Sequence, residues 1–243
     1  MKDTQLVDLF QKARKDNSLA VIEGVQAIKH AVRFKAAIKE VLTCDIKFLE
    51  NLLDELAPDV KTEILSQAKE VSEETFQKLS PQPPRTKAIA LADRRIYKLT
   101  ELEDAKPIVF LEDPRDLENI GAVIRVAAAA DAAAVCVSGP ADIWHPAIIR
   151  GGAGLHYALP VLNITTEEVL ALPRPKLALD PTGSEYFATS SASNTIYIFG
   201  TERHGISPTL LKKTDGILRL TMKQGVSSLN LATSVAATLY RKC

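Results

Sequence analysis

The chain has 243 residues, and its 30 basic side chains are matched by 30 acidic ones, so the formal net charge is zero. This balance excludes a uniformly basic nucleic-acid coat, although a local basic patch is compatible with it. Apolar residues make up 46% of the chain and charged residues 25%, close to the globular average, which argues against wholesale disorder. The length predicts one large domain or two small ones.

Three features of the sequence predict a cytoplasmic protein with no membrane segment and no metal. The first ten residues, MKDTQLVDLF, lack the apolar core of a signal peptide. The most apolar stretch, residues 122–137, is short for a membrane span and is interrupted by charged residues. No CxxC pair or zinc-binding pattern connects the three scattered cysteines, Cys44, Cys136 and Cys243.

The amino-acid composition of the sequence changes near residues 101–106, where we place a linker between domains at 1–100 and 107–243. The first part is rich in lysine and glutamate and contains one glycine, Gly24, whereas the second contains the other ten of the 11. Apolar spacing in the first part predicts helices at 24–33, 47–56 and 73–79 and strands at 38–42, 60–65 and 88–91. This pattern indicates a small α/β layer domain.

The second part alternates strand-like and helix-like segments. We expect strands at 108–111, 133–137, 176–179, 196–199 and 218–220. Helices are expected from Asn119, a candidate N-cap, to about residue 130, at 208–213 with Pro208 in the first turn, and at 228–241. The alternation predicts an α/β fold with a mostly parallel sheet covered by helices on both faces.

In such sheets, ligands bind beyond the carboxyl ends of the strands. Three predicted strands lead into polar or glycine-bearing loops there, at 112–125, 200–205 and 221–230, which indicates a pocket for a small ligand with hydrogen-bonding edges. A conventional nucleotide site is disfavoured, because no GxGxxG turn follows the first strand and no GxxxxGK[ST] loop is present. The glycine-rich run 151–154 follows no clear strand.

The same loops carry three motifs that resemble those of the SpoU/TrmH class of SPOUT RNA methyltransferases. NIGAVIR (119–125) has the Asn of the first motif, a Gly two residues later and an Arg six residues later. IYIFGTERHGIS (196–207) matches a strand followed by G-[N/S]-E-x-x-G-[I/L]-S, with Thr in place of Asn or Ser. LTMKQGVSSLN (220–230) matches M-K-x-G-x-x-S-L-N before a helix. In this order and at strand ends, the motifs form a strong signal covering 107–243.

The first motif departs from the family pattern D-P-x-N-x-G. When Asp113 and Pro114 are matched to the first two positions, the loop before Asn119 is predicted to be three residues longer than usual. In the first domain, IEGVQAIKHAV followed by AAIKEVL resembles the small RNA-binding domain, related to an α/β ribosomal protein fold, that precedes many such catalytic domains. Glu23 and Gly24 fit its pattern.

The resemblance implies a donor, an acceptor and an assembly. The donor is S-adenosylmethionine, the acceptor is a ribose 2′-hydroxyl of a structured RNA, with ribosomal RNA favoured over transfer RNA, and the second domain is a trefoil knot that pairs into a homodimer. A non-catalytic RNA-binding relative, or methylation of a base nitrogen, stays open as an alternative. The implied cofactor-binding residues are Phe199, Gly200, Thr201, Gly205, Leu218, Leu220, Met222, Ser228 and Leu229.

The resemblance also implies catalytic residues: Asn119, Arg125, Glu202, Ser228 and Asn230. A guanidinium has a pKa above roughly 12, so Arg125 is better suited to stabilise a developing alkoxide than to remove a proton. A phosphate clamp or a structural ion pair is the alternative for Arg125. Asn119, Ser228 and Asn230 could be helix caps alone, and Glu202 could serve only to accept backbone N–H bonds.

Basic residues suggest where RNA binds, with a solvated charged face as the alternative. The candidates are Lys29, Arg33, Lys35, Lys39, Arg203 and Lys223. The C-terminal helix carries an apolar stripe that fits either a homodimer interface or packing on its own sheet. Its members are Leu229, Ala232, Val235, Ala236 and Leu239.

Overall fold

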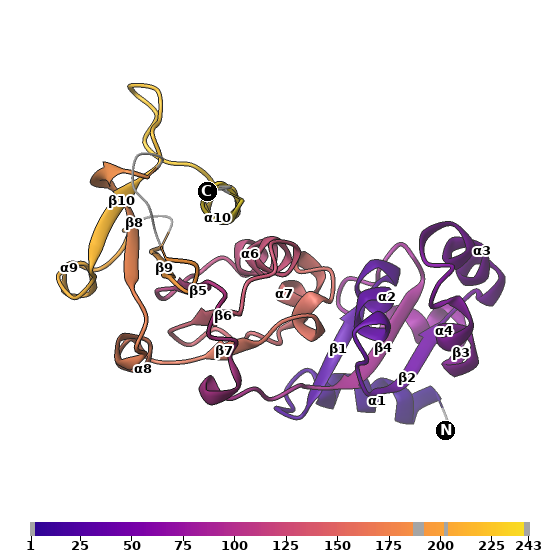
Figure 1. Cartoon of the computed structure of the whole chain (residues 1–243). Helices are drawn as coiled ribbons and strands as arrows, with labels where there is room; N and C mark the ends of the chain where they lie inside the picture. Colours follow the sequence, from indigo (N-terminus) through magenta and orange to yellow (C-terminus); the bar gives the residue numbers. More distant parts are fainter. Residues whose placement is uncertain (1–2, 187–191, 202–203, 241–243) are drawn as a thin grey trace. The chain divides into compact units, whose positions relative to one another are not determined.

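The computed structural model describes residues 3–186, 192–201 and 204–240 (Figure 1). The chain divides into two compact units. Unit 1 comprises Met1–Ile96 and Trp144–Ala158, and unit 2 comprises Tyr97–Ile143 and Leu159–Cys243. Within the described ranges, no helix has both the length and the apolar character needed to cross a bilayer.

Unit 1 contains a four-stranded sheet with the strand order β1-β4-β2-β3. Strand β4 runs antiparallel to both β1 and β2, and β3 is parallel to β2. The predicted strands at 38–42 and 88–91 are confirmed, whereas β1 and β3 were not predicted. The bounds are β1 Leu19–Glu23, β2 Ile38–Thr43, β3 Ala68–Glu70 and β4 Ala88–Asp93.

Helices pack on both faces of this sheet. On one face, Phe10 and Phe76 are buried against Ile89 and bring α1 (Asp3–Ala13) and α5 (Glu73–Lys78) onto the sheet. The other helices of the N-terminal stretch are α2 (Val25–Arg33), α3 (Ile46–Leu56) and α4 (Lys61–Gln67). The three predicted helices are thus confirmed, and α1 was not predicted.

The prediction of a strand at 60–65 is wrong, because this stretch begins α4. Ile64 N–H donates to Val60 O over 3.0 Å, a helical hydrogen bond, and Ile64 is fully buried. Apolar residues at 60 and 64 fit both a strand period of two and a helical spacing of four. The local pattern therefore did not distinguish the two structures.

Unit 1 is completed by a segment from the middle of the chain, Trp144–Ala158, which contains α7 (Pro146–Gly151) and the 3-10 turn η2 (Leu155–Tyr157). The side chains of Ile148 and His156 are fully buried. Arg150 Nη1 donates to the buried carboxylate of Glu23 over 3.2 Å, and His30 Nδ1 lies 2.8 Å from Ala153 O. The segment is therefore part of the core of unit 1. The glycine-rich run 151–154 lies within it, at the end of α7.

Unit 2 contains a six-stranded sheet within the described part of the chain, in the order β10-β8-β9-β5-β6-β7. All neighbouring strands are parallel, as predicted. The chain builds β5, β6 and β7 toward one edge and then continues on the other side of β5, which creates a topological switch between β5 and β9. The bounds are β5 Ile108–Leu111, β6 Ala134–Val137, β7 Val161–Asn163, β8 Lys176–Glu185, β9 Ile196–Phe199 and β10 Gly216–Arg219.

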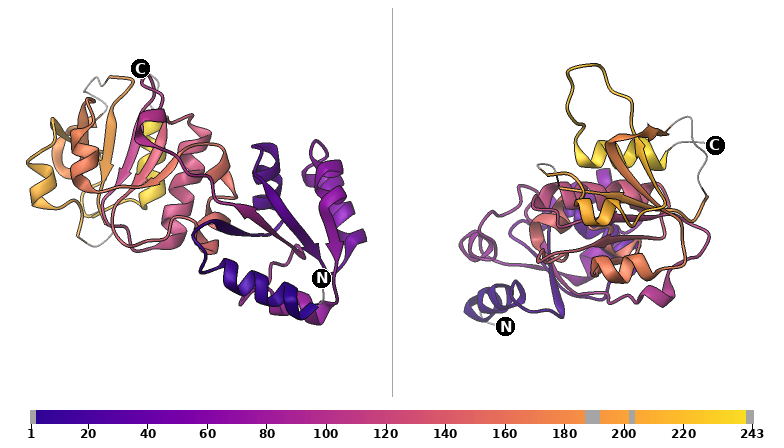
Figure 2. Two further views of the ribbon diagram at one scale, coloured as in Figure 1. Left: turned by 90° about the horizontal axis from the view of Figure 1, so that it is seen from below. Right: turned by 90° about the vertical axis from the view of Figure 1, so that its left-hand side faces the viewer.

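Both faces of this sheet are covered. Val169 of α8 (Thr166–Ala171) and Leu210 of α9 (Pro208–Leu211) are buried in one cluster with Ile108, Phe110 and Ile198. On the other side, α6 (Leu117–Ala129) and α10 (Leu231–Leu239) pack against each other. The residues between β10 and α10 leave the sheet as an exposed loop (Figure 2).

Two predicted helix starts need correction. Helix α6 begins at Leu117, and its N-cap is Asp116, whose carboxylate accepts from Glu118 N and Asn119 N, so Asn119 lies in the first turn. Helix α10 begins at Leu231 rather than at 228, and its N-cap is Asn230.

Candidate active site

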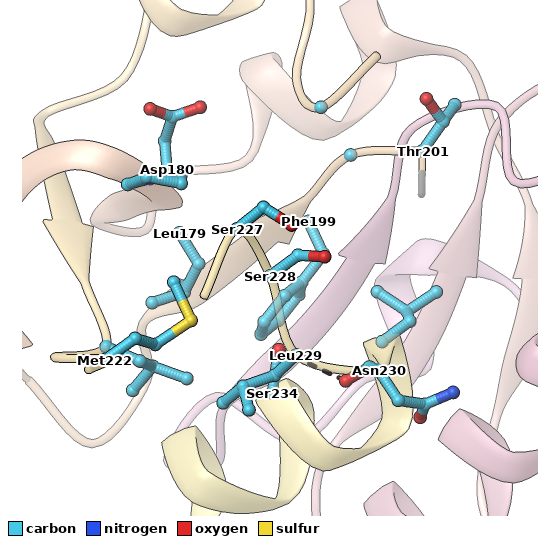
Figure 3. A pocket seen from close by; sticks show the side chains of 15 residues that line it. Leu179, Asp180, Phe199, Thr201, Met222, Ser227, Ser228, Leu229, Asn230 and Ser234 are labelled. Atoms are coloured by element: carbon cyan, nitrogen blue, oxygen red, sulfur yellow. Dashed lines mark hydrogen bonds between the residues drawn. The ribbon is translucent and has the colours of Figure 1, made fainter. Parts of the chain in front are cut away.

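A pocket of about 570 Å³ lies at the carboxyl ends of the strands of unit 2 (Figure 3). This volume is in the range of small-molecule sites, roughly 300–1,000 Å³. Eight of the nine predicted cofactor-binding residues line it: Phe199, Gly200, Thr201, Gly205, Leu220, Met222, Ser228 and Leu229. The ninth, Leu218, is buried in β10 and is not a lining residue.

Backbone geometry closes the loop after β9 tightly. Thr201 N–H donates to Gly205 O over 3.1 Å, and Gly205 N–H donates to Thr201 O over 3.0 Å. A Cβ on Gly200 would lie 2.0 Å from the carbonyl carbon of Gly205, so only glycine fits there. Gly205 has φ +65, and a Cβ added to it would have Asp180 Oδ2, at 3.8 Å, as its nearest neighbour. The wall at Gly205 is therefore open to a ligand.

Strand β8 contributes wall residues that were not predicted from the sequence. Its ladder with β10 is interrupted, because Ile217 pairs with Ala178 whereas the next residue, Leu218, pairs with Ser184. The intervening residues 179–183 bulge out of the ladder, and Leu179, Asp180 and Pro181 line the pocket. Asp180 directly follows a predicted strand, so the rule that directed us to the other strand ends could have found it.

The loop before α10 and the helix itself form another wall. Ser227, Leu231 and Ser234 line the pocket there in addition to the predicted residues. Asn230 Oδ1 accepts from Ala232 N over 3.0 Å and from Thr233 N over 3.3 Å, which caps α10. Its Nδ2 donates to Asn119 Oδ1 over 3.0 Å. The capping role and the contact with the first motif are thus both present at Asn230.

A second hydrogen-bonded pair connects the ends of β5 and β9. The carboxylate of Glu112 accepts from Ser207 N over 2.7 Å and from Ser207 Oγ over 2.6 Å. Ser207 also caps α9 by accepting from Leu210 N. This pair fixes the end of the loop that begins at Gly200. Glu112 was not predicted as a site residue.

The structure does not bring Arg125 into the pocket wall. Arg125 is exposed on α6, and it has no hydrogen bond or ion pair with any residue in the described part of the chain. The structural-ion-pair alternative therefore has no support among these residues. Glu202 and Arg203 lie outside the described residues.

The capping geometry of α6 bears on the predicted length of the loop before Asn119. Aligned on Asn119, D-P-x-N-x-G places its Asp at Asp116, which is the observed N-cap, and its Pro at Leu117. Leu117 is the first helical residue, a position where proline is favoured in general. The capping geometry favours this alignment, and the longer loop inferred by matching Asp113 and Pro114 stays a prediction.

The basic candidates of unit 1 are engaged with their own unit. Arg33 donates two hydrogen bonds of 2.7 Å to Asp59, Lys39 Nζ lies 2.7 Å from Asp93, and Lys35 Nζ lies 3.7 Å from Glu63. Lys29 Nζ donates to Leu56 O over 3.1 Å. In unit 2, Lys223 is exposed on the loop before α10. Acids of unit 1 thus pair with Arg33, Lys35 and Lys39.

Comparison with known proteins identifies the family. Residues 106–240, more than half of the chain, match the SpoU rRNA methylase family. The chain belongs to this family. Among its curated relatives, the 23S rRNA (guanosine(2553)-2′-O)-methyltransferase RlmP of Bacillus subtilis (strain 168) is 25% identical over 242 residues, covering 95% of this chain and 90% of the relative.

Solved structures of SpoU methylases share the fold over nearly the whole chain. An RNA 2′-O ribose methyltransferase superposes with a TM-score of 0.79 at 27% identity and covers 98% of this chain and 93% of its own. The SpoU methyltransferase AviRb from Streptomyces viridochromogenes, in complex with AdoMet, has a TM-score of 0.78 at 23% identity and covers 98% and 95%. The predicted α/β fold with a parallel sheet flanked by helices is confirmed.

Proposed function

We propose that this SpoU methylase transfers a methyl group from S-adenosylmethionine to a ribose 2′-hydroxyl of ribosomal RNA. The observation that carries the proposal is the convergence of three motifs on one pocket. Residues of the second and third motifs line it, and Asn119 of the first motif is held at its edge by Asn230. Curated relatives matched over nearly their full length are 23S rRNA 2′-O-methyltransferases, which supports the choice of acceptor.

The lining residues fit S-adenosylmethionine. Leu220, Met222 and Leu229 offer apolar surface for the adenine and the methionine chain, and hydroxyls of Thr201, Ser227 and Ser228 offer hydrogen bonds. The open space beside Gly205 leaves room that any larger residue would fill. When bound, S-adenosylmethionine supplies an activated methyl group together with its leaving group.

The proposed roles of the chain's own residues follow from where they lie. Asn119 and Asn230 orient the ribose at the pocket edge, and Ser228 contributes a polar contact from the loop before α10. Glu202 lies outside the described residues, and its catalytic role stays a prediction from the motif. Arg125 is exposed and outside the pocket wall, so we assign it to the RNA rather than to the cofactor. There its guanidinium stabilises negative charge on the attacking oxygen.

Unit 1 is proposed to supply RNA affinity through Lys29, Arg33, Lys35 and Lys39, with Lys223 and Arg203 as contributors from unit 2. The double variant Arg33→Glu/Lys39→Glu should lower the slope of RNA affinity against salt concentration while leaving cofactor affinity unchanged. Lys78→Glu is the matched control, because Lys78 is an exposed, ion-paired lysine of the same unit outside the candidate group. An equal loss of RNA affinity in the double variant and in Lys78→Glu would contradict the assignment of RNA binding to these residues.

A homodimer and a cytoplasmic location complete the proposal. The stripe on α10 does not support pairing, because Val235 is fully buried and α10 packs on α6 of the same chain. Exposed apolar side chains at Val226 and Tyr240, outside the stripe, support it instead. Sedimentation that finds only monomer at micromolar concentration would refute the dimer. Cys44 and Cys136 are free thiols, as in reducing compartments.

One experiment tests the proposed reaction directly. Deproteinised 23S and 16S rRNA are incubated with the protein and methyl-labelled S-adenosylmethionine, and the labelled nucleosides are identified after digestion. Label in a 2′-O-methylated nucleoside is expected. Label in a methylated base, or no label in either RNA although the cofactor binds, would overturn the proposed acceptor.

A further inference from the structure

The pocket contains a single charged side chain, Asp180, among the lining residues that the structure describes. The other lining residues are apolar, hydroxyl-bearing, amide-bearing or glycine. Among these described residues, the Asp180 carboxylate is the one source of negative charge. Asp180 is half-buried, so its charge lies where a ligand in the pocket would meet it.

The bulge in β8 holds this carboxylate in a fixed orientation. Asp180 Oδ1 accepts from Thr182 N over 2.9 Å and from Thr182 Oγ1 over 2.6 Å. The other oxygen, Oδ2, lies beside Gly205, 3.8 Å from where a Cβ would stand, and has no hydrogen bond or ion pair with a described residue. Asp180 stands across the pocket from Asn230 (Figure 3). One oxygen anchors the side chain, and the other is available to a ligand.

The two forms of the cofactor differ in charge. S-adenosylmethionine carries a sulfonium, an ammonium and a carboxylate, and its net charge is positive. On methyl transfer the electrons of the carbon–sulfur bond stay on sulfur, a carbon–oxygen bond forms to the ribose, and the hydroxyl proton leaves to solvent. The product S-adenosylhomocysteine is therefore a neutral thioether zwitterion.

We propose that Asp180 is a specificity-determining residue that favours the cationic methyl donor over the neutral product. The inference rests on the proposed function and deepens it. The carboxylate attracts the sulfonium form and loses that attraction when the methyl group has left, so it promotes exchange of product for fresh donor. Attraction between unit charges in a half-exposed pocket changes an equilibrium constant by roughly three- to thirty-fold.

Asp180→Asn tests the inference in the full-length chain, because Asn keeps an oxygen for both hydrogen bonds from Thr182 and removes only the charge. Affinities for S-adenosylmethionine, S-adenosylhomocysteine and sinefungin, which carries an ammonium in place of the sulfonium, are measured by titration calorimetry. Asp215→Asn is the matched control: Asp215 is in the same unit, its carboxylate also accepts a backbone N–H, from Lys176, and it lies outside this pocket.

Asp180→Asn should lower the affinity for S-adenosylmethionine and for sinefungin by roughly three- to thirty-fold. The affinity for S-adenosylhomocysteine should change by less than about twofold. Asp215→Asn should change none of them. In the parent protein, raising the salt concentration to about 1 M should lower the affinities for S-adenosylmethionine and sinefungin more than the affinity for S-adenosylhomocysteine, because the Debye length falls to about 3 Å.

An equal loss of affinity for all three ligands would show that Asp180 contacts a part that they share. No loss of affinity for any of them would show that the charge of Asp180 does not act on the bound ligand. Either result overturns the inference and leaves the proposed function standing. Failure of the parent protein to bind any of the three would instead overturn the proposed function.

Discussion

Asn230 Nδ2 donates a hydrogen bond to Asn119 Oδ1 over 3.0 Å and so joins the N-cap of α10 to the first turn of α6. The cap fixes the orientation of the Asn230 amide, because Oδ1 is occupied by two backbone N–H groups. Its NH₂ must then face Asn119, and Asn119 must present its oxygen. A local capping interaction thus sets the orientation of a proposed site residue 111 positions away.

Asn230→Asp separates the two roles of this residue. Asp caps helices as well as Asn does, so the free energy of unfolding in urea should change by less than about 0.5 kcal/mol. The donor toward Asn119 is lost, and a carboxylate now faces Asn119, so the single-turnover methylation rate should fall at least about tenfold. Asn163→Asp, which removes an amide donor to Ala141 O elsewhere in unit 2, is the control. An unchanged methylation rate would show that Asn230 serves only as the N-cap of α10.

Arg125→Ala tests charge stabilisation against RNA binding. Because Arg125 is exposed and does not line the pocket, cofactor affinity should stay within a few-fold of the parent. The single-turnover rate at saturating RNA should fall about a hundredfold or more, as for loss of a donor worth about 2.7–4 kcal/mol. Arg125→Lys should restore little of the methylation rate, because an ammonium lacks the planar, two-pronged donor geometry of a guanidinium.

Arg219→Ala, which removes another exposed arginine of unit 2, serves as the control for Arg125. If Arg125→Ala raises only the RNA concentration required and preserves the maximal rate, Arg125 is a phosphate clamp.

Gly200→Ala should abolish measurable cofactor binding. Its Cβ would stand 2.0 Å from the carbonyl carbon of Gly205, so Gly205, which lines the pocket, has to move out of place. Gly216→Ala is the control, since a Cβ there meets only the end of the flexible Leu177 side chain at 3.1 Å. Titration of both variants with S-adenosylmethionine checks the prediction, and normal binding by Gly200→Ala would place the cofactor elsewhere.

Glu23→Ala should destabilise unit 1 by about 3 kcal/mol. The Glu23 side chain is only 3% exposed and accepts from Arg14, Ser80 and Arg150, so its removal leaves the buried Ser80 hydroxyl and the largely buried Arg14 without this acceptor. Arg150→Ala should cost less than about 1 kcal/mol, because the Arg150 side chain is 41% exposed. Urea unfolding of both variants measures the difference; similar losses would contradict this reasoning.

Sequence patterns predicted most of the sheet in unit 2, since buried parallel strands such as Ile108–Leu111 are continuous apolar runs between turn signals. They also predicted most of the pocket, because motifs at strand ends converge wherever the strands are parallel. Asp180 follows the predicted strand 176–179, so the strand-end rule could have singled it out, but that it faces the pocket depends on the bulge set by the register between β8 and β10. Register is a non-local property that a single segment does not encode.

Helix starts were harder to predict than helices. Asp116 and Asn119 both suit an N-cap, and only the observed backbone shows that Asp116 accepts from the first-turn N–H groups. The wrong strand at 60–65 has a similar origin, because two apolar positions four apart satisfy either period. The burial of Trp144–Ala158 in unit 1 was not predicted either, since its partners, Glu23 and His30, are more than 120 positions away in the sequence.

The interrupted course of the chain through unit 1 also sets an order of events during translation. All residues of its sheet have been synthesised once residue 96 is made, yet α7, which packs against the edge strand β1, comes only with residues 146–151. At about 5–20 residues per second, the ribosome needs roughly 3–12 s to reach the end of Trp144–Ala158. During that interval, β1 lacks its packing against α7 and Glu23 lacks its hydrogen bond from Arg150, while β5 and β6 are already being made. A chaperone that binds nascent chains would therefore encounter this protein while unit 1 still lacks Trp144–Ala158 and unit 2 still lacks Leu159–Cys243.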